Sequence, residues 1–223
     1  MGGSEDRAQL PLWGWEERLR KTKPFVIVVS GPSGAGKTTL VAELVKRDTS
    51  LHRSVSCTTR PPREGEEEGV AYFFLTGAEF EAQKQGNLIE WAEVHEHFYG
   101  TPRDAIEKAF GRGVDVVLNI DVQGGKQVKK SFPDAVMIFI LPPSFAVLEQ
   151  RIRGRATDSE SDIDMRLEGA REEIRALPVY EYLVLNDELE EAVGTLRAII
   201  ESERCRRIRY DQSFIERFES GSS

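Results

Sequence analysis

The chain has 223 residues, of which 39% are hydrophobic and 30% are charged, and its formal net charge at pH 7 is −8. This composition is typical of a soluble globular protein with a sizeable core, and its acidity disfavours binding to nucleic acids or anionic membranes. No apolar run approaches the ~18 residues that span a bilayer, and no signal-peptide pattern is present, so we expect a cytoplasmic protein. The two cysteines, Cys57 and Cys205, lack metal-ligand spacing, and we expect both to be reduced thiols.

The chain opens with Met-Gly-Gly-Ser-Glu-Asp, a composition that favours disorder, so residues 1–23 are expected to form a partly disordered N-terminal extension. Residues 24–29 are a short apolar run rich in β-branched residues, which predicts a buried parallel strand. A later set of apolar residues has the spacing of the inner face of an amphipathic helix: Leu40, Val41, Leu44 and Val45.

Between this strand and this helix, residues 31–38 read Gly-Pro-Ser-Gly-Ala-Gly-Lys-Thr and fit the phosphate-loop (P-loop) pattern. Glycines let the backbone curl and direct its N–H groups at an anion, and the helix N-terminus adds partial positive charge. Lys37 is expected near the β- and γ-phosphates and the Thr38 hydroxyl at Mg²⁺. An ordinary glycine-rich turn needs no Lys-Thr pair, so the motif predicts a nucleotide phosphate site made of Gly31, Pro32, Ser33, Gly34, Ala35, Gly36, Lys37, Thr38 and Thr39.

Residues 51–69 form a polar region in which the pair Pro61-Pro62 excludes a helix. The next segments predict a strand, a short helix and another strand at residues 70–75, 77–85 and 88–94. These segments do not follow a regular strand–helix alternation, so we expect a small mixed insert.

Two arginines lie three residues apart in this proline-stiffened region, Arg60 and Arg63, and Tyr72 and Tyr99 follow. Guanidinium groups match the oxygens of a phosphate monoester, and phenols donate hydrogen bonds without adding charge. The pattern therefore predicts a phosphate monoester site. The alternatives are that the arginines pair with the run of glutamates at residues 66–68 and that the tyrosines are core aromatics.

Glu90 is a lone carboxylate in the otherwise apolar segment Leu-Ile-Glu-Trp. A carboxylate can accept two hydrogen bonds from an N1–H and N2–H₂ edge, which guanine has and adenine lacks. Glu90 therefore predicts a guanine site, the alternative being a surface charge on an edge strand.

Regular alternation follows. We expect strands at residues 114–120, 135–141 and 182–185, and helices at residues 101–111 (or to 113), 121–130, 145–154 and 189–200. The last helix is expected to continue as a basic segment from Arg204 to Arg209. This alternation predicts an α/β fold with a doubly wound parallel sheet and its ligand at the carboxyl ends of the strands.

Residues 151–171 are dense in charge and poor in large apolar side chains. Such a segment gains little from burial, so we expect it to pack weakly and to act as a mobile helical lid.

Taken together, these motifs resemble guanylate kinase, the enzyme that phosphorylates GMP from ATP, from Pro24 to about Glu203. The motifs are residues 31–38, 54–66, 99–102, 120–124, 141–144 and the pair Asn186-Asp187. The resemblance implies a P-loop nucleoside monophosphate kinase-like fold, in which helices flank a parallel sheet core and a small mixed α/β GMP-binding lobe and a helical lid are attached. It implies a domain over residues 24–209, with core 24–53, 102–147 and 171–209, GMP-binding lobe 54–101 and lid 148–170, followed by a C-terminal tail, 210–223.

The resemblance also implies roles for individual residues, with ATP and GMP as substrates, dGMP as a further acceptor, and Mg²⁺ as cofactor. The guanine base would be contacted by Ser56, Glu90, Thr101 and Asp121. The GMP phosphate would be held by Arg60, Arg63, Tyr72 and Tyr99. The ATP phosphates and the transferring group would be held by Lys37, Thr38 and the lid arginines Arg151, Arg155 and Arg166, and Asn186 would lie near the adenine. The catalytic set would be Lys37, Arg60, Arg151, Arg155 and Arg166, although each lid arginine has the alternative of a solvated helix face.

The sequence departs from the family pattern at Asn119, where the family usually carries a carboxylate, and at Ala71, where an Asp is common. Two other functions are considered. A non-catalytic guanylate-kinase-like module that binds phosphopeptides usually lacks an intact P-loop, which this chain has. A P-loop kinase for a phosphorylated sugar would have little use for Glu90 and Ser56. The enzyme is therefore favoured, and the sequence leaves open whether it is a monomer or a homo-oligomer.

Overall fold

The structure is a computed structural model that describes residues 22–94, 96–154 and 159–220. The expected N-terminal extension up to residue 21, the lid residue Arg155 and the last three residues therefore lie outside the described residues.

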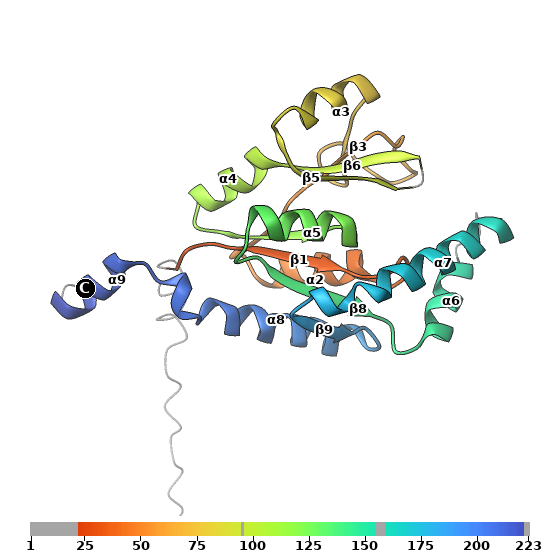
Figure 1. Cartoon of the computed structure of the whole chain (residues 1–223). Coiled ribbons are helices and arrows are strands. Elements are labelled where there is room, and N and C mark those ends of the chain that lie inside the picture. Colours follow the sequence, from red (N-terminus) through yellow and green to blue (C-terminus); the bar gives the residue numbers. More distant parts are fainter. Residues whose placement is uncertain (1–21, 95, 155–158, 221–223) are drawn as a thin grey trace, which may run out of the picture.

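A five-stranded parallel sheet forms the core, and its strand order is β2-β7-β1-β8-β9 (Figure 1). In that order the strands are Leu51–Arg53, Asp115–Asn119, Val26–Ser30, Val136–Leu141 and Tyr182–Leu185. The expectation of a parallel sheet is confirmed. Strand β2 was not predicted, because its three residues lack an apolar run and lie at the sheet edge, where it pairs only with β7.

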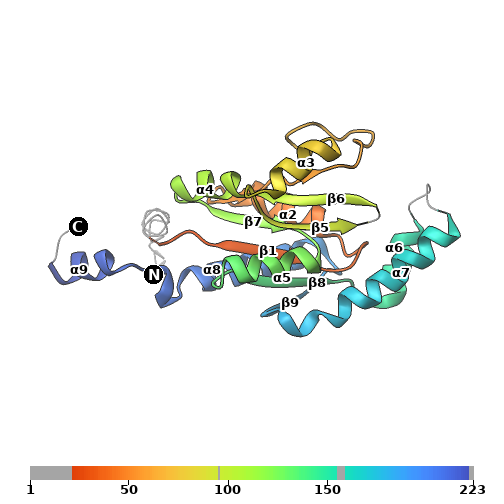
Figure 2. The ribbon, with the colours of Figure 1, turned by 45° about the horizontal axis from the view of Figure 1, so that its top comes forward.

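Helices cover both faces of this sheet because the central strands are apolar on both sides. Along β1, Ile27 and Val29 join the cluster formed with α2 (Lys37–Arg47) and α8 (Leu189–Arg204). The alternate residues Val26 and Val28 join the cluster formed with α4 (Arg103–Gly111) and α5 (Val122–Ser131). In Figure 1 α5 lies above the sheet and α8 below it, and Figure 2 shows the same ribbon with the α5 side turned toward the viewer.

A second, mixed sheet of order β4-β3-β6-β5 forms the lobe above α5 in Figure 1. Its elements are β3 Cys57–Thr58, β4 Phe73–Phe74, α3 Gly77–Lys84, β5 Leu88–Val94 and β6 His97–Pro102. The expected small mixed insert is present, but the strand predicted at residues 70–75 is confined to Phe73–Phe74.

The helix predicted from Thr101 begins two residues later, at Arg103. Thr101 and Pro102 instead end β6, which pairs antiparallel with β5. Pro102 has extended dihedral angles and is the N-cap of α4. Proline is tolerated at a strand end, where its missing N–H is not needed, so the helix-start signal was misplaced by two residues.

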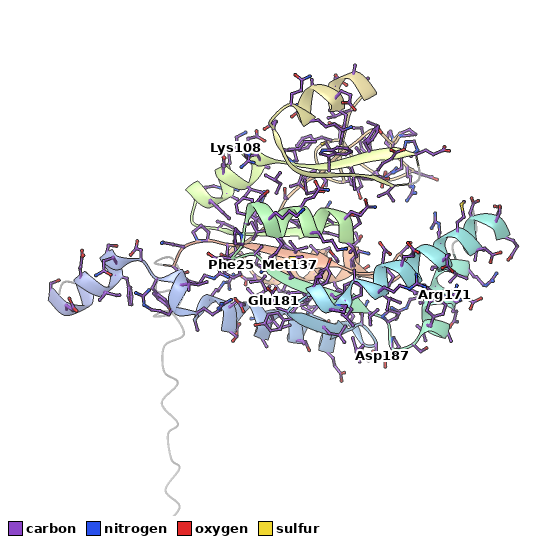
Figure 3. The ribbon with its side chains drawn as sticks, in the orientation of Figure 1. Phe25, Lys108, Met137, Arg171, Glu181 and Asp187 are labelled. Carbon is purple, nitrogen blue, oxygen red and sulfur yellow. The ribbon has the colours of Figure 1, made fainter. Side chains whose placement is uncertain are left out.

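Helices α6 (Phe145–Arg153) and α7 (Glu160–Arg175) form a hairpin that projects from one end of the core sheet (Figure 1). We expected this charged segment to pack weakly, and that expectation is wrong. The hairpin has a buried cluster of its own, consisting of Leu148, Ile152, Ile163, Leu167 and Ala170. Arg171, labelled in Figure 3, adds a cation–π contact, with its guanidinium 4.8 Å from the centre of the Phe145 ring.

The basic segment from Arg204 to Arg209 is not a helical extension, because α8 ends at Arg204 and a 3₁₀ turn, Arg207–Arg209, follows. Arg204 and Arg209 are both buried. Arg204 donates to Asp115 (2.8 Å) and Asp48 (3.0 Å), and Arg209 lies 3.4 Å from the Glu203 carboxylate. A last helix, α9 (Gln212–Ser220), occupies most of the predicted tail.

Both cysteine thiols are free, Cys57 buried and Cys205 exposed. Within the part of the chain that the structure describes, no helix combines the length and apolar character needed to cross a membrane.

Candidate active site

The P-loop connects the end of β1 to the start of α2, and its backbone needs glycine. Gly31 and Gly36 have φ values of 148° and 86°, which side-chain-bearing residues rarely adopt. A Cβ atom on Gly31 would lie 2.2 Å from the Ile140 carbonyl oxygen, and one on Gly36 would lie 2.3 Å from Asn186 Nδ2. The P-loop is thus packed closely against β8 and against the loop after β9. This close packing fixes the direction of the N–H groups of the P-loop.

Asn186 and Arg151 support this loop. The buried Asn186 amide donates to the Ala35 carbonyl (2.7 Å), and Arg151 Nη2 donates to the Asn186 carbonyl (3.1 Å). From the family resemblance we expected Asn186 near the adenine and Arg151 at the ATP phosphates. In the structure both residues hold the P-loop, and their contacts with a nucleotide remain predictions.

Lys37 and Thr38 begin α2 at the mouth of the loop. Lys37 Nζ donates to the carbonyls of Gly31 and Pro32, at 2.5 and 3.1 Å. Asn119, at the end of β7, donates from its amide to Thr38 Oγ1 at 3.2 Å. The residue that departs from the family pattern therefore contacts the hydroxyl predicted to reach Mg²⁺, while Thr39 is exposed in the first turn of α2.

Glu173, near the end of α7, was not predicted from the sequence. Its carboxylate accepts a hydrogen bond from the Ser33 N–H of the P-loop at 3.3 Å. Burial raises the pKa of Glu173, and the nearby charge of Lys37 opposes this effect. No sequence signal distinguishes Glu173 from its neighbours, because α7 is rich in acidic residues.

A buried acidic site lies between β5, β6 and the start of α5. Thr101 Oγ1 donates to Glu90 Oε1 at 2.5 Å, and both side chains are buried. Asp121 is the N-cap of α5 and accepts from the Gly124 N–H at 2.7 Å. Burial raises the pKa of Glu90 to about 7; the Thr101 hydrogen bond opposes this and the Asp121 charge adds to it.

Glu90 lies directly against α5. A Cβ atom on Gly124 would be 2.5 Å from Glu90 Oε2, so a larger residue at Gly124 would displace the carboxylate. The structure brings together three of the four residues predicted for the guanine base, Glu90, Thr101 and Asp121. The fourth, Ser56, precedes β3 and is half-buried.

Arg60 is the buried centre of the predicted phosphate site. Its two terminal nitrogens both donate to the Glu66 carboxylate at 2.9 Å, and its Nε donates to the Tyr99 hydroxyl at 3.3 Å. The guanidinium also lies 5.5 Å from the centre of the Tyr72 ring. Glu66 further accepts from the Arg63 N–H at 2.8 Å.

The alternative pairing of Arg60 with the glutamate run is therefore observed, at Glu66. It is compatible with a phosphate site, because a guanidinium has five N–H donors and the Tyr99 hydroxyl, which accepts from Arg60, keeps its own proton to donate. Arg63 is exposed at the rim of this site, and Arg166 is half-buried on α7.

A family model described as guanylate kinase matches residues 21–203. The guanylate kinase of Carboxydothermus hydrogenoformans is 46% identical over 185 residues, covering 82% of this chain and 91% of that protein. That of Thermotoga maritima is 46% identical over 197 residues, covering 88% and 95%. The crystal structure of guanylate kinase from Anaplasma phagocytophilum is 33% identical, with a TM-score of 0.72, covering 85% of this chain and 90% of that one.

The chain belongs to the guanylate kinase family. The resemblance inferred from the motifs is thus confirmed, and so is the P-loop nucleoside monophosphate kinase-like fold. The boundaries given above for the core, the GMP-binding lobe and the lid of this guanylate kinase family member remain predictions, as do the roles of the individual site residues.

Proposed function

We propose that the chain catalyses reversible transfer of the ATP γ-phosphoryl group to GMP, giving ADP and GDP. The observation that carries this proposal is that an intact P-loop and the buried Glu90–Thr101 pair occur in one chain. The P-loop suits a triphosphate, and a buried carboxylate with a free oxygen suits the two N–H donors of guanine. A phosphopeptide-binding module needs neither the P-loop nor the Glu90–Thr101 pair, and a kinase for a phosphorylated sugar has no use for the Glu90–Thr101 pair.

Guanine recognition is assigned to Glu90, supported by Thr101, Asp121 and Ser56. The Glu90 carboxylate accepts from the guanine N1–H and N2–H₂ groups, whereas adenine leaves it without donors. Rejection of such a mismatched base reaches about 10⁴-fold or more. None of these groups is assigned to the ribose 2′-hydroxyl, so dGMP is proposed as a second acceptor.

The GMP phosphate is assigned to the guanidinium of Arg60, with Arg63 and the hydroxyls of Tyr72 and Tyr99. Glu66 and the Pro61 carbonyl fix the orientation of the Arg60 guanidinium, which leaves one Nη2 N–H for the phosphate, with the tyrosine hydroxyls as further donors. Charge-assisted hydrogen bonds of this kind are about twice as strong as neutral ones.

The ATP phosphates are assigned to the N–H groups of the P-loop and to Lys37, with the Asn186 side of the loop toward the adenine. The Thr38 hydroxyl fits Mg²⁺, because P-loop proteins hold this ion with one hydroxyl, phosphate oxygens and waters. Bound Mg²⁺ supplies charge neutralisation at the phosphates. The arginines Arg151, Arg155 and Arg166 are assigned to the transferring group.

Catalysis in this site requires alignment more than proton transfer. The GMP phosphate is already an anionic nucleophile near neutral pH, so the protein must hold two anions in line and neutralise their repulsion. Closure of the α6–α7 hairpin would exclude water, which otherwise competes for the γ-phosphoryl group.

A coupled assay for ADP formation tests the proposal, with Mg-ATP as donor and GMP, dGMP, AMP, UMP or CMP as acceptor. We expect turnover with GMP and dGMP and at least about 10³-fold lower kcat/KM with the other three. A Lys37→Ala variant is the control for the P-loop and is expected to be folded but inactive. Equal use of AMP and GMP by the unmodified protein would refute the proposed guanine site.

A further inference from the structure

Strand β5 is an outer strand of the lobe sheet, and its free edge faces helix α5 of the core. At this edge the main chain of Trp91 is paired with a side chain. Gln127 Oε1 accepts from the Trp91 N–H at 3.2 Å, and Gln127 Nε2 donates to the Trp91 carbonyl at 2.6 Å. The Gln127 amide thus makes the same two bonds that a residue of a neighbouring strand would make.

Gln127 lies on the face of α5 that also forms the guanine site. Asp121, Gly124 and Gln127 are spaced three residues apart, so they share one side of the helix. Neighbouring residues of β5 contact successive turns of this face: Glu90 lies against Gly124, and Trp91 is bonded to Gln127. The position of α5 relative to β5 therefore sets the position of the Glu90 carboxylate.

We propose that Gln127 is a positioning residue for guanine selection, which acts by fixing the Trp91 main chain against α5 and thereby holding Glu90 at Gly124. This inference rests on the proposed function, because it names how the GMP site of that reaction is held. Consecutive Cα atoms are about 3.8 Å apart, so a displacement at Trp91 is transmitted to Glu90 almost undiminished. Without the amide, the β5 edge is solvated by water and the Glu90 carboxylate is less firmly excluded from solvent.

The bonds to Gln127 lie at a solvent-exposed edge, whereas Glu90 is buried. Losing hydrogen bonds at an exposed edge costs little folding free energy, because water replaces them. Misplacing a buried carboxylate by a fraction of an ångström weakens base binding directly. The effect of Gln127 is therefore expected on GMP recognition and not on the stability of the fold.

The test compares Gln127→Ala and Gln127→Glu with a Lys126→Ala control. Glu keeps the shape of Gln but lacks the N–H that donates to the Trp91 carbonyl. Lys126 is the exposed preceding residue of α5. For both Gln127 variants we expect the KM for GMP to rise about tenfold, with kcat at saturating GMP and the KM for ATP within about twofold of the parent. Lys126→Ala is expected to match the parent.

A second readout is the pH dependence of the KM for GMP. The groups facing Glu90 are the Thr101 hydroxyl on β6, Asp121 on α5 and Cys57 on β3, and neither substitution changes them. If Gln127 keeps the Glu90 carboxylate dehydrated, Gln127→Ala is expected to lower the pKa of Glu90 and to move the inflection of the profile to lower pH, whereas the added carboxylate of Gln127→Glu opposes that shift. Isothermal titration of GMP into each protein repeats the comparison without turnover.

The inference is overturned if the Gln127 variants bind GMP as the parent does with an unshifted pH profile. It is also overturned if kcat and both KM values deteriorate together with the melting temperature, which would indicate a purely structural role. A parent protein that does not phosphorylate GMP refutes the proposed function instead, and the inference with it.

Discussion

Glu90 is a buried carboxyl group whose environment differs clearly from water. The residue is 4% exposed and its carboxylate receives a hydrogen bond from Thr101, and burial brings its pKa to about 7. An ordinary glutamate has a pKa near 4.3 and would be fully ionised at neutral pH. At neutral pH the carboxyl of Glu90, in the proposed guanine site, is therefore close to the midpoint between its neutral and ionised forms.

A Glu90 pKa of about 7 predicts that GMP binding depends on pH. The N–H donors of guanine bind the ionised form of Glu90. A neutral Glu90 carboxyl must therefore lose its proton before GMP binds. Above pH 7 the ionised form is already present, and below about pH 7 the KM for GMP is expected to rise by up to about tenfold per pH unit. Glu90→Gln should abolish this inflection and retain any inflection that belongs to the GMP phosphate. A parent profile identical to that of Glu90→Gln would contradict the assignment.

Asn119 gives a second prediction at this scale. Its neutral amide contacts the Thr38 hydroxyl, where a carboxylate would attract the positively charged Mg²⁺ and its waters more strongly. Asn119→Asp is therefore expected to lower the Mg²⁺ concentration that gives half-maximal turnover at fixed ATP. Titration of Mg²⁺ into assays of both proteins measures this concentration. Equal Mg²⁺ concentrations at half-maximal turnover would show that residue 119 does not act on the metal.

At the scale of elements, the α6–α7 hairpin has a buried cluster of its own, consisting of Leu148, Ile152, Ile163, Leu167 and Ala170. A segment with its own apolar contacts moves as a unit, because breaking those contacts costs more than rotating about its ends. The Glu173–Ser33 bond ties the last turns of α7 to the P-loop. We therefore expect the hairpin to close as a rigid body about its base, rather than by local folding.

Arg166 lies midway along α7, between the tip of the hairpin and the Glu173 contact with the P-loop, on the part that closure would carry toward the substrates. Arg166→Met is expected to lower kcat by about 10²-fold, the effect of a lost charge contact in the transition state, with a smaller change in GMP binding. Steady-state kinetics measure the first quantity and calorimetry the second. A kcat within a few-fold of the parent would assign Arg166 to the solvated face of the helix.

At the scale of the whole molecule, Arg204 joins the end of α8 to the edge of the core sheet. Its guanidinium is buried and donates to Asp115, Asp48 and the Ser50 hydroxyl, at 2.8, 3.0 and 2.7 Å. Removing one partner of a buried ion pair leaves the others charged and unpaired. This network therefore holds the end of α8 against β7 and the loop before β2, at that edge of the sheet.

Arg204→Met is expected to lower the free energy of unfolding by about 3–5 kcal/mol, measured by urea denaturation. Arg197→Ala is the matched control, because the Arg197–Glu201 pair is exposed, with a separation of 3.7 Å, and exposed pairs contribute about 0–1 kcal/mol. Equal losses in the two variants would show that burial of the Arg204 network has no special effect.

The sequence by itself determined the features that depend on neighbouring residues. Strands β1, β7 and β8 were predicted as apolar runs, because a strand buried on both faces needs no polar side. The edge strand β9 was also predicted as an apolar run, although its Leu183 and Leu185 are exposed. The P-loop was predicted because its glycines and its Lys-Thr pair lie within one short segment whose chemistry does not depend on distant residues. Glu90 was singled out because a charge in an apolar strand is unusual wherever that strand packs.

Only the tertiary structure decided the features that join distant segments. Strand β2 exists because β7 pairs with it, and Thr101 is a strand residue because β5 pairs with β6. The bonds from Glu173 to Ser33 and from Gln127 to Trp91 link residues 140 and 36 positions apart. Such contacts leave no local pattern in the sequence. A polar side chain hydrogen-bonds equally well to water until the fold brings a protein partner within hydrogen-bond distance.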